Sequence, residues 1–498
     1  MPAIITNKFR INNADQFSES FSETANNKYY LGIGRPQPFG TLTRPDTRTD
    51  YEGTDTNPIT PGDTVVREFY TYDDLLAAKR VQSSDISFVI PRRNWISGTV
   101  YDIYRHDYGE FITGSTTTRQ TSNSAATTLF DSTFYVLTSA RNVYKCLDNN
   151  NNATSTDEPT GVSTSVTTTA DGYRWKYMYT LSAAQQANFL SVDFMAVSPN
   201  SSPGSDQSNV ISAAVDGSID VIKIKSAGSG GANGTHTNIP IRGDGTGGVC
   251  SVTVSGGAVT AVSVTNAGSG YTFATVSNAQ IVAAGATSLA GAELDVIIPP
   301  KGGHGANARE ELGGFFVMMN TSLEGTESAN SGDVSAVNDF RKIVLLRDPT
   351  KSASAVTSNT ARLTKAIRIA GSPTPGTFTV DEEINQASTG AVGKVVEWDA
   401  TNRILYYIQT RHNDAGVDAN GNQTAFSGAN VITGQGGGAP TGTPEVATTG
   451  TVNNVSFTSG YSEPEIDHDT GDVLYIENRT PIQRATDQTE NIKLVIEF

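Results

Sequence analysis

The first candidates for chemistry are acidic and amide side chains whose oxygen atoms alternate along the chain. Asp418, Asn420 and Asn422 have the alternate spacing of a calcium-binding loop. An EF-hand needs glycine at the sixth position of its loop, however, and Gly421 stands at the fourth. We therefore predict a solvated turn at 418–422 rather than a calcium site.

A second oxygen-rich segment contains Asp467, Asp469 and Asp472, with His468 among them. Irregular loops of carboxylates can hold calcium, because this ion accepts six to eight oxygen ligands in flexible geometry. The alternative is an exposed acidic loop, which is the more common use of such a segment. We predict no metal-binding residues, and a structural ion between Asp467 and Asp472 stays open.

Nucleophilic and phosphate-binding motifs give no support for catalysis. The glycine run GDGTGG at 243–248 is not followed by Lys-Ser or Lys-Thr, so a β-turn is favoured over a phosphate-binding loop. Neither a GxSxG elbow nor an SxxK motif is present. A polysaccharide depolymerase would need two carboxylates that face each other across a groove. The sequence alone cannot exclude such a pair. We predict that the chain is not an enzyme and has no catalytic or cofactor-binding residues.

The histidines and cysteines also lack the spacing of a metal site. No HExxH pair occurs, and each histidine lies among Gly, Asn or Asp residues, where an exposed polar role is expected. Cys146 and Cys250 belong to no CxxC motif and fall in regions that we expect to be different domains, so no disulfide is predicted. The five histidines are His106, His236, His304, His412 and His468.

Composition indicates a mainly β protein. Charged residues are only 17% of the 498 residues, against a usual ~25%, and Thr, Ser, Asn and Gly dominate the polar set. Thr packs well on a pleated sheet, while Asn and Gly accept turn dihedrals. The net charge of −16 argues against nonspecific nucleic-acid binding. With no 18-residue apolar run and no apolar leader after the first residues, no membrane span or secretion signal is expected.

Periodicity places short helices among many strands. Helices are expected at 10–24, from Thr71 onward, and after Ser182, where Ser182 and Gln185 have capping-box spacing. Alternating aromatics at 173–179 either line one sheet face or stack on sugars, and we favour packing. Strands are predicted at 133–138, 142–147, 174–181, 342–347, 378–384, 392–398, 403–410, 472–479 and 492–498, with a linker at 198–209.

The segment after the expected linker repeats itself. VIKIKSAGSGG at 221–231 corresponds to AVSVTNAGSGY at 261–271, and each copy is an alternating strand that ends in AGSG. Glycine permits the positive φ of a tight turn. Two copies predict a small duplicated β module, since a solenoid needs about three.

Several segments resemble the baseplate wedge subunit of T-even-like phages known as gene product eight, in a version with insertions like those of cyanobacterial viruses. The most specific is GDVLYIENRTPIQRATDQTENIKLVIEF at 471–498. The others are TNKFR at 6–10, IPRRNW at 90–95 followed by Tyr101 and Tyr104, VYKCLDN at 143–149 and DGYRWKYMYTL at 171–181. The resemblance covers about 1–205, 312–350 and 456–498.

The resemblance implies a structural subunit with an antiparallel β-sandwich core, long loops and no catalytic residues. It would be a homodimer within each wedge of a six-fold baseplate, assembled in the host cytoplasm with other wedge proteins as partners, and it would rearrange with them when the tail contracts. The domains expected are a family-like region at 1–205, a glycine-rich duplicated insertion at 206–300, a return to the core at 301–350, a second β insertion at 351–455 and core-completing strands at 456–498.

Two groups of residues are candidates for partner contacts. Arg92, Arg93 and Trp95 form the arginine and aromatic mixture of interface hot spots, although they could equally close a core and pair locally. Glu477, Asn478 and Arg479 interrupt an apolar strand and need partners, either in an internal polar network or in a neighbouring subunit. An adhesin that binds host glycans through the inserted modules is the alternative function.

Overall fold

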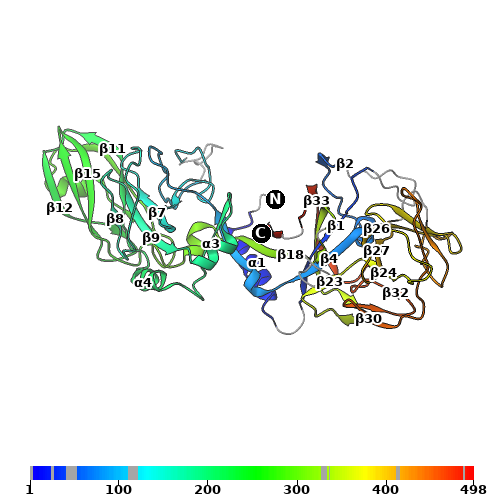
Figure 1. Cartoon of the computed structure of the whole chain (residues 1–498). Coiled ribbons are helices and arrows are strands. Elements are labelled where there is room, and N and C mark those ends of the chain that lie inside the picture. Colours follow the sequence, from blue (N-terminus) through cyan, green and yellow to red (C-terminus); the bar gives the residue numbers. More distant parts are fainter. Residues whose placement is uncertain are drawn as a thin grey trace. The chain divides into compact units, whose positions relative to one another are not determined.

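The chain forms two compact units, each assembled from separated segments. The computed structural model describes residues 4–23, 27–40, 53–109, 122–326, 334–335, 337–410, 416–485 and 488–498. Unit 1 comprises 1–16, 87–318 and 495–498, and unit 2 comprises 17–86 and 319–494 (Figure 1). Strands predominate, most sheets are antiparallel and the helices are short, which confirms the mainly β prediction. The module boundaries expected from the sequence stay predictions.

In chain order, the elements that begin in unit 1 or at its boundaries are α1 (Asn7–Ser20), β5 (Ile86–Pro91), β6 (Tyr135–Leu137), β7 (Asn142–Asp148), β8 (Thr167–Thr168), β9 (Arg174–Thr180), α3 (Ala183–Phe189), β10 (Phe194–Ala196), α4 (Ser205–Ala213), β11 (Ile222–Ser229), β12 (Gly234–Pro240), β13 (Arg242–Gly243), β14 (Val249–Ser255), β15 (Ala258–Asn266), β16 (Ala274–Thr275), α5 (Asn278–Ala283), β17 (Ala290–Val296), α6 (Ala308–Leu312) and β18 (Phe316–Thr326).

The elements that begin in unit 2 are β1 (Tyr29–Gly34), β2 (Gly53–Thr54), β3 (Asn57–Pro58), α2 (Val65–Thr71), η1 (Tyr72–Asp74), β4 (Leu75–Val81), η2 (Ser83–Asp85), β19 (Val334–Ser335), β20 (Phe340–Arg347), β21 (Thr350–Lys351), β22 (Ser354–Ala355), β23 (Thr360–Arg362), β24 (Lys365–Arg368), β25 (Glu383–Gln386), β26 (Ala391–Asp399), β27 (Ile404–Ile408), β28 (Ile432–Gly434), β29 (Thr441–Gly442), β30 (Gly450–Val452), β31 (Val455–Phe457), β32 (Tyr461–Ser462), β33 (Asp472–Ile482) and β34 (Thr489–Glu497).

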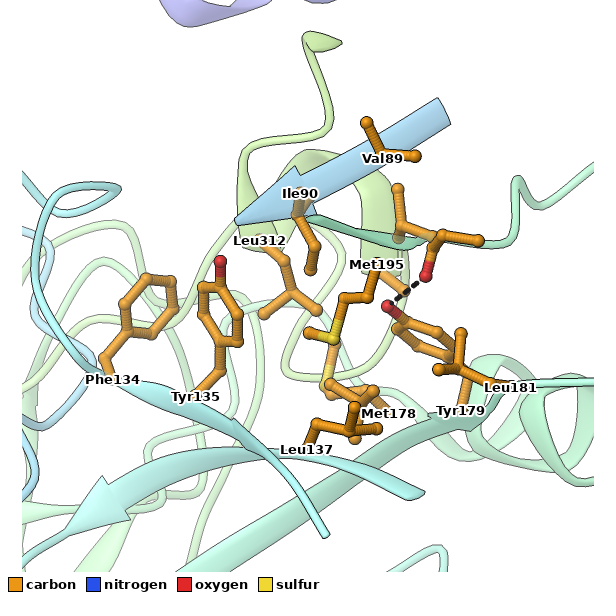
Figure 2. Packing of buried hydrophobic residues seen from close by; sticks show 14 of the residues in the cluster. Val89, Ile90, Phe134, Tyr135, Leu137, Met178, Tyr179, Leu181, Met195 and Leu312 are labelled. Atoms are coloured by element: carbon orange, nitrogen blue, oxygen red, sulfur yellow. Dashed lines mark hydrogen bonds between the residues drawn. The ribbon is translucent and has the colours of Figure 1, made fainter. Parts of the chain in front are cut away.

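The largest core of unit 1 packs strand side chains against helix α6. Figure 2 shows Ile90 of β5, Leu137 of β6, Tyr179 of β9 and Leu312 of α6 around Met195 of β10, all of them buried. The Tyr179 hydroxyl donates a hydrogen bond of 2.8 Å to the carbonyl of Ala196, so its polar atom is satisfied inside the core.

A β-bulge divides the aromatic stripe of β9 between two cores. Tyr144 of β7 pairs with Tyr177, and Val143 pairs with Tyr179, so Met178 is the extra residue. Tyr177 therefore packs in one cluster with Tyr173 and Trp175, whereas Tyr179 enters the other core. The packing role predicted for these aromatic side chains is confirmed. The prediction that they all line one face of the sheet is wrong.

The glycine-rich repeat has the same backbone conformation in both copies. Gly228 and Gly268 have φ near +64° (65° and 63°), and Gly230 and Gly270 have φ of 77° and 74°. A residue with a Cβ rarely adopts such angles, which explains why AGSG recurs. Around these turns lie the sheet β12-β14-β15 and the pairs β11-β17 and β13-β16.

Unit 2 is built on the sheet β23-β4-β1-β20-β33. Leu75 to Ala78, which we expected in a helix beginning at Thr71, lie in β4 and are buried. The helix is instead α2, which ends at Thr71 and is capped by the Thr64 side chain. The prediction was wrong because the Asp74 carboxylate binds Lys342 instead of capping a helix.

The second large sheet of unit 2 closes on itself. Its strand order is β29-β28-β25-β26-β27-β24-β32. Directly after β29, Glu445 N donates to Arg368 O and Ala370 N donates to Thr443 O, each at 2.8 Å, which connects this end back to β24. Apolar residues including Ile384, Val395 and Leu405 fill the interior. Closure leaves fewer unpaired edges than an open sheet of the same strands.

Three other local predictions have clear outcomes. The capping box of Ser182 and Gln185 is present at α3. The first helix, expected at 10–24, instead spans Asn7–Ser20, with the Thr6 hydroxyl accepting from Phe9 N before its first turn. The linker predicted at 198–209 is wrong in its second half, where α4 begins and buries Val210.

Strands β18 and β34 pair with each other, and each contains a boundary between the units. Within unit 1, Phe498 N donates to Phe315 O at 3.2 Å, and within unit 2, Gly325 N donates to Gln488 O at 3.0 Å. These bonds make the pair antiparallel. Residues 488–498 thus supply backbone hydrogen bonds to both units.

Candidate functional site

The arginine and tryptophan group at 92–95 lies in unit 1, with each side chain engaged inside the unit. Arg92 donates to Ser191 O at 2.7 Å, and Arg93 donates to Phe130 O at 2.8 Å while its guanidinium lies over the Tyr135 ring. Trp95 Nε1 donates to Ser155 at 3.1 Å. Each side chain is half-buried, so a role as a partner surface stays a prediction.

Glu477, Asn478 and Arg479 lie on β33, which is the edge strand of the central sheet of unit 2. Glu477 accepts from the Tyr475 hydroxyl at 3.0 Å, and Asn478 Nδ2 donates to Ile59 O at 3.2 Å. Within the described part of the chain, Asn478 Oδ1 and Arg479 Nε are buried and have no hydrogen-bond partner. Unsatisfied buried polar atoms are costly, and both of these atoms are already shielded from solvent by the chain itself.

The two candidate metal sites are occupied by internal bonds. The Asp418 carboxylate accepts from Asn420 N and Asn422 N at 2.8 and 2.9 Å, which confirms a turn and lowers the pKa of Asp418. Asp467 binds Lys351, which lowers its pKa, and Asp472 binds Arg347. Among the described residues, no group of three or more His, Cys, Asp or Glu side chains is placed to hold a metal.

One histidine contradicts its predicted exposure. His304 is fully enclosed, and burial together with the positive charges of Lys145 and Lys176 holds its pKa well below the usual 6.5. The prediction failed because the His304 ring packs against the Tyr104 ring, with 4.9 Å between the ring centroids, rather than facing solvent. His106 and His468 are exposed, His236 is half-buried, and His412 lies outside the described residues. Both cysteines are buried and free.

The GDGTGG segment is a turn built around a carboxylate. Asp244 accepts from Thr272 N and Phe273 N at 2.9 and 3.0 Å, and these bonds with the Thr272 hydroxyl lower its pKa to about 2. A fixed negative charge at this position would repel a phosphate. The turn predicted for this segment is confirmed.

Two buried ion pairs were missed by the sequence reasoning. Lys145 of β7 binds Glu311 of α6 in unit 1, and Lys342 of β20 binds Asp74 of η1 at 2.8 Å in unit 2. Both lysines interrupt strongly apolar strands, VYKCL and RKIVLL. A lysine in such a strand is almost never buried without a partner, so the signal was available.

Unit 2 also contains a polar cavity of about 280 Å³. Its lining comes from η1, β21, β24, the end of β27, the segment after 421 and the loop after β32. Asp73 is fully buried there, and its Oδ1 lies 3.1 Å from both His468 Nε2 and Gln423 Nε2. Lys365 donates to Gln409 at 2.7 Å and lies 3.8 Å from Glu463.

A comparison with protein families identifies the class of this chain. The family model described as Phage-Gp8 (Bacteriophage T4, Gp8) matches residues 3–157 and 441–498. The chain is therefore a structural protein of a phage baseplate. It belongs to the Gp8 family, with the interval 158–440 outside the match. No curated protein matches the chain. No helix in the described segments is long and apolar enough to cross a membrane.

Proposed function

We propose that this chain is a wedge subunit of a contractile-tail baseplate, working as a homodimer that links other wedge proteins and rearranges with them at contraction. The observation that carries the proposal is the edge strand β33. It lies in the matched segment 441–498, and among the described strands of its sheet it pairs with β20 alone.

A neighbouring protein would pair with this edge. A partner strand or loop placed along β33 would hydrogen-bond to the backbone donors and acceptors of its outer edge. In contrast, the guanidinium groups of Arg92 and Arg93 already donate to carbonyls of their own unit. We therefore place the principal contact at β33 and assign Arg92, Arg93 and Trp95 mainly to the fold. No reaction is required of such a subunit.

Light scattering of the purified full chain, alone and mixed with baseplate proteins of the same virus, tests the proposal. We expect a dimer that joins a larger complex of fixed stoichiometry. Arg479→Ala should weaken that complex about tenfold, as for loss of a charged hydrogen bond, whereas Arg242→Ala on exposed β13 should not. A monomer or trimer that ignores those proteins would contradict the wedge assignment.

A further inference from the structure

The polar cavity of unit 2 has walls of two kinds. One side carries charged and amide groups, among them Asp73, Lys365, Gln423 and Glu463. Apolar side chains, including Leu363, Ile408 and Pro464, line the same space. The cavity thus offers hydrogen-bond donors and acceptors together with a surface for C–H groups.

The cavity is lined by three carboxylates and two lysines, and internal contacts hold these charges in place. Lys365 is fixed by Gln409 and lies near Glu463, Lys351 binds Asp467, and Asp73 contacts Gln423 and His468. A ligand with a net charge would meet both signs at short range and lose part of its hydration without a dedicated counter-charge. A neutral ligand with many hydroxyls avoids this cost, because each hydroxyl can donate to a carboxylate and accept from an ammonium or amide.

Size limits the ligand further. Pockets for drug-sized molecules are usually ~300–1,000 Å³, so a cavity of about 280 Å³ suits a ligand no larger than a single sugar ring or two. A pyranose has hydroxyls at its rim and C–H groups on its faces, which corresponds to the two kinds of wall.

We propose that this cavity binds a neutral sugar residue, such as one unit of a cell-surface polysaccharide. Glu463 accepts from sugar hydroxyls and Lys365 donates to them, while Ile408 and Leu363 contact the C–H face of the ring. The part of the cavity lining that contains Asp73 is rigid, because Asp73 is adjacent to Asp74, and the Asp74 carboxylate binds Lys342 of β20. Binding needs no conversion of the sugar and does not depend on the proposed wedge role.

Saturation-transfer NMR on the full chain tests this site, with glucose, galactose, mannose and N-acetylglucosamine as neutral probes and glucuronate as a charged one. We expect transfer to at least one neutral sugar. Glu463→Gln should raise its dissociation constant about tenfold through loss of a charged hydrogen bond. Asn422→Trp, at an exposed lining residue, should block the cavity.

Glu293→Gln is the matched control, because Glu293 is also an exposed glutamate paired with a lysine, Lys225 at 3.0 Å, and it lies in unit 1. It should leave binding unchanged, and thermal melting of all three variants checks that they fold. The proposal is overturned if no neutral sugar receives saturation, if only glucuronate does, or if both cavity variants bind as the original chain does.

Discussion

Each unit buries a lysine of an apolar strand beside a carboxylate, and the two units hold that carboxylate in different ways. In unit 1, Glu311 faces one lysine, Lys145, and also accepts from Gly305 N and Asn307 N at 2.9–3.0 Å. In unit 2, Asp74 receives two cations, Lys342 at 2.8 Å and Arg35 at 3.8 Å. The first carboxylate is held by backbone donors, and the second by charge.

Each pair joins a segment inside the family match to one outside it. Lys145 and Asp74 fall within residues 3–157, whereas Glu311 and Lys342 fall in the unmatched interval. The unmatched interval therefore completes both cores and is not merely decoration on a finished protein. Because an unpaired buried charge is costly, neither core tolerates loss of its partner residue.

Breaking the pair of unit 2 at its carboxylate should have the largest effect. Asp74→Asn leaves the buried Lys342 without the carboxylate that it binds, and we expect the free energy of unfolding to fall by about 3–5 kcal/mol. Urea denaturation followed by circular dichroism measures this change. A loss below about 1 kcal/mol would show that the two cations are not held by Asp74.

The matching change in unit 1 should cost less. Glu311→Gln removes the carboxylate from one cation rather than two, and Lys145 keeps the Tyr104 ring 5.0 Å away. We expect a loss of about 2 kcal/mol in the same denaturation experiment. If Glu311→Gln proves more damaging than Asp74→Asn, the bonds from Gly305 N and Asn307 N to the carboxylate contribute more than the second cation at Asp74.

The pH dependence of unit 1 should reveal its buried histidine. The pKa of His304 is depressed in the folded protein, so below about 6.5 the unfolded chain binds the proton and the folded chain does not. The contribution of the neutral His304 ring to the free energy of unfolding is therefore fully present above pH 6.5. Below this pH, the free energy of unfolding falls by up to about 1.4 kcal/mol per pH unit. His304→Phe should reduce the loss between pH 7.5 and 5.5, whereas an unchanged slope would contradict the assignment.

An exposed ion pair should give the smallest effect. Asp472 pairs with Arg347 on the surface of unit 2, with side chains 59% and 41% exposed. Asp472→Asn is expected to change the free energy of unfolding by less than about 1 kcal/mol. Measured beside Asp74→Asn, this variant separates burial of the charge from loss of a carboxylate as such.

Local signals in the sequence predicted much of the fold. The apolar strands at 142–147 and 174–181 and the capping box at Ser182 depend on neighbouring residues, and all three are present. The helix expected after Thr71 failed because Asp74 binds a residue 268 positions away. Such a partner is invisible to a local pattern.

Only part of the candidate sites could be predicted from the sequence. The apolar residues around Glu477, Asn478 and Arg479 predicted a strand whose polar side chains require hydrogen-bond partners. Its position at the edge of the sheet could not be predicted, because the strand order brings together residues from opposite ends of the chain. The cavity was not predicted, because its walls come from segments between residues 72 and 468. The spacing of residues along the chain does not indicate which distant segments lie together in the fold.

Strand β34 has a consequence for synthesis on the ribosome. Residues 488–498 bond to both units, so β18 lacks its β34 partner until this segment has left the exit tunnel. Until then the side of β18 that faces β34 presents unpaired backbone donors and acceptors to other chains. Loss of this segment would therefore leave β18 without this partner strand in both units.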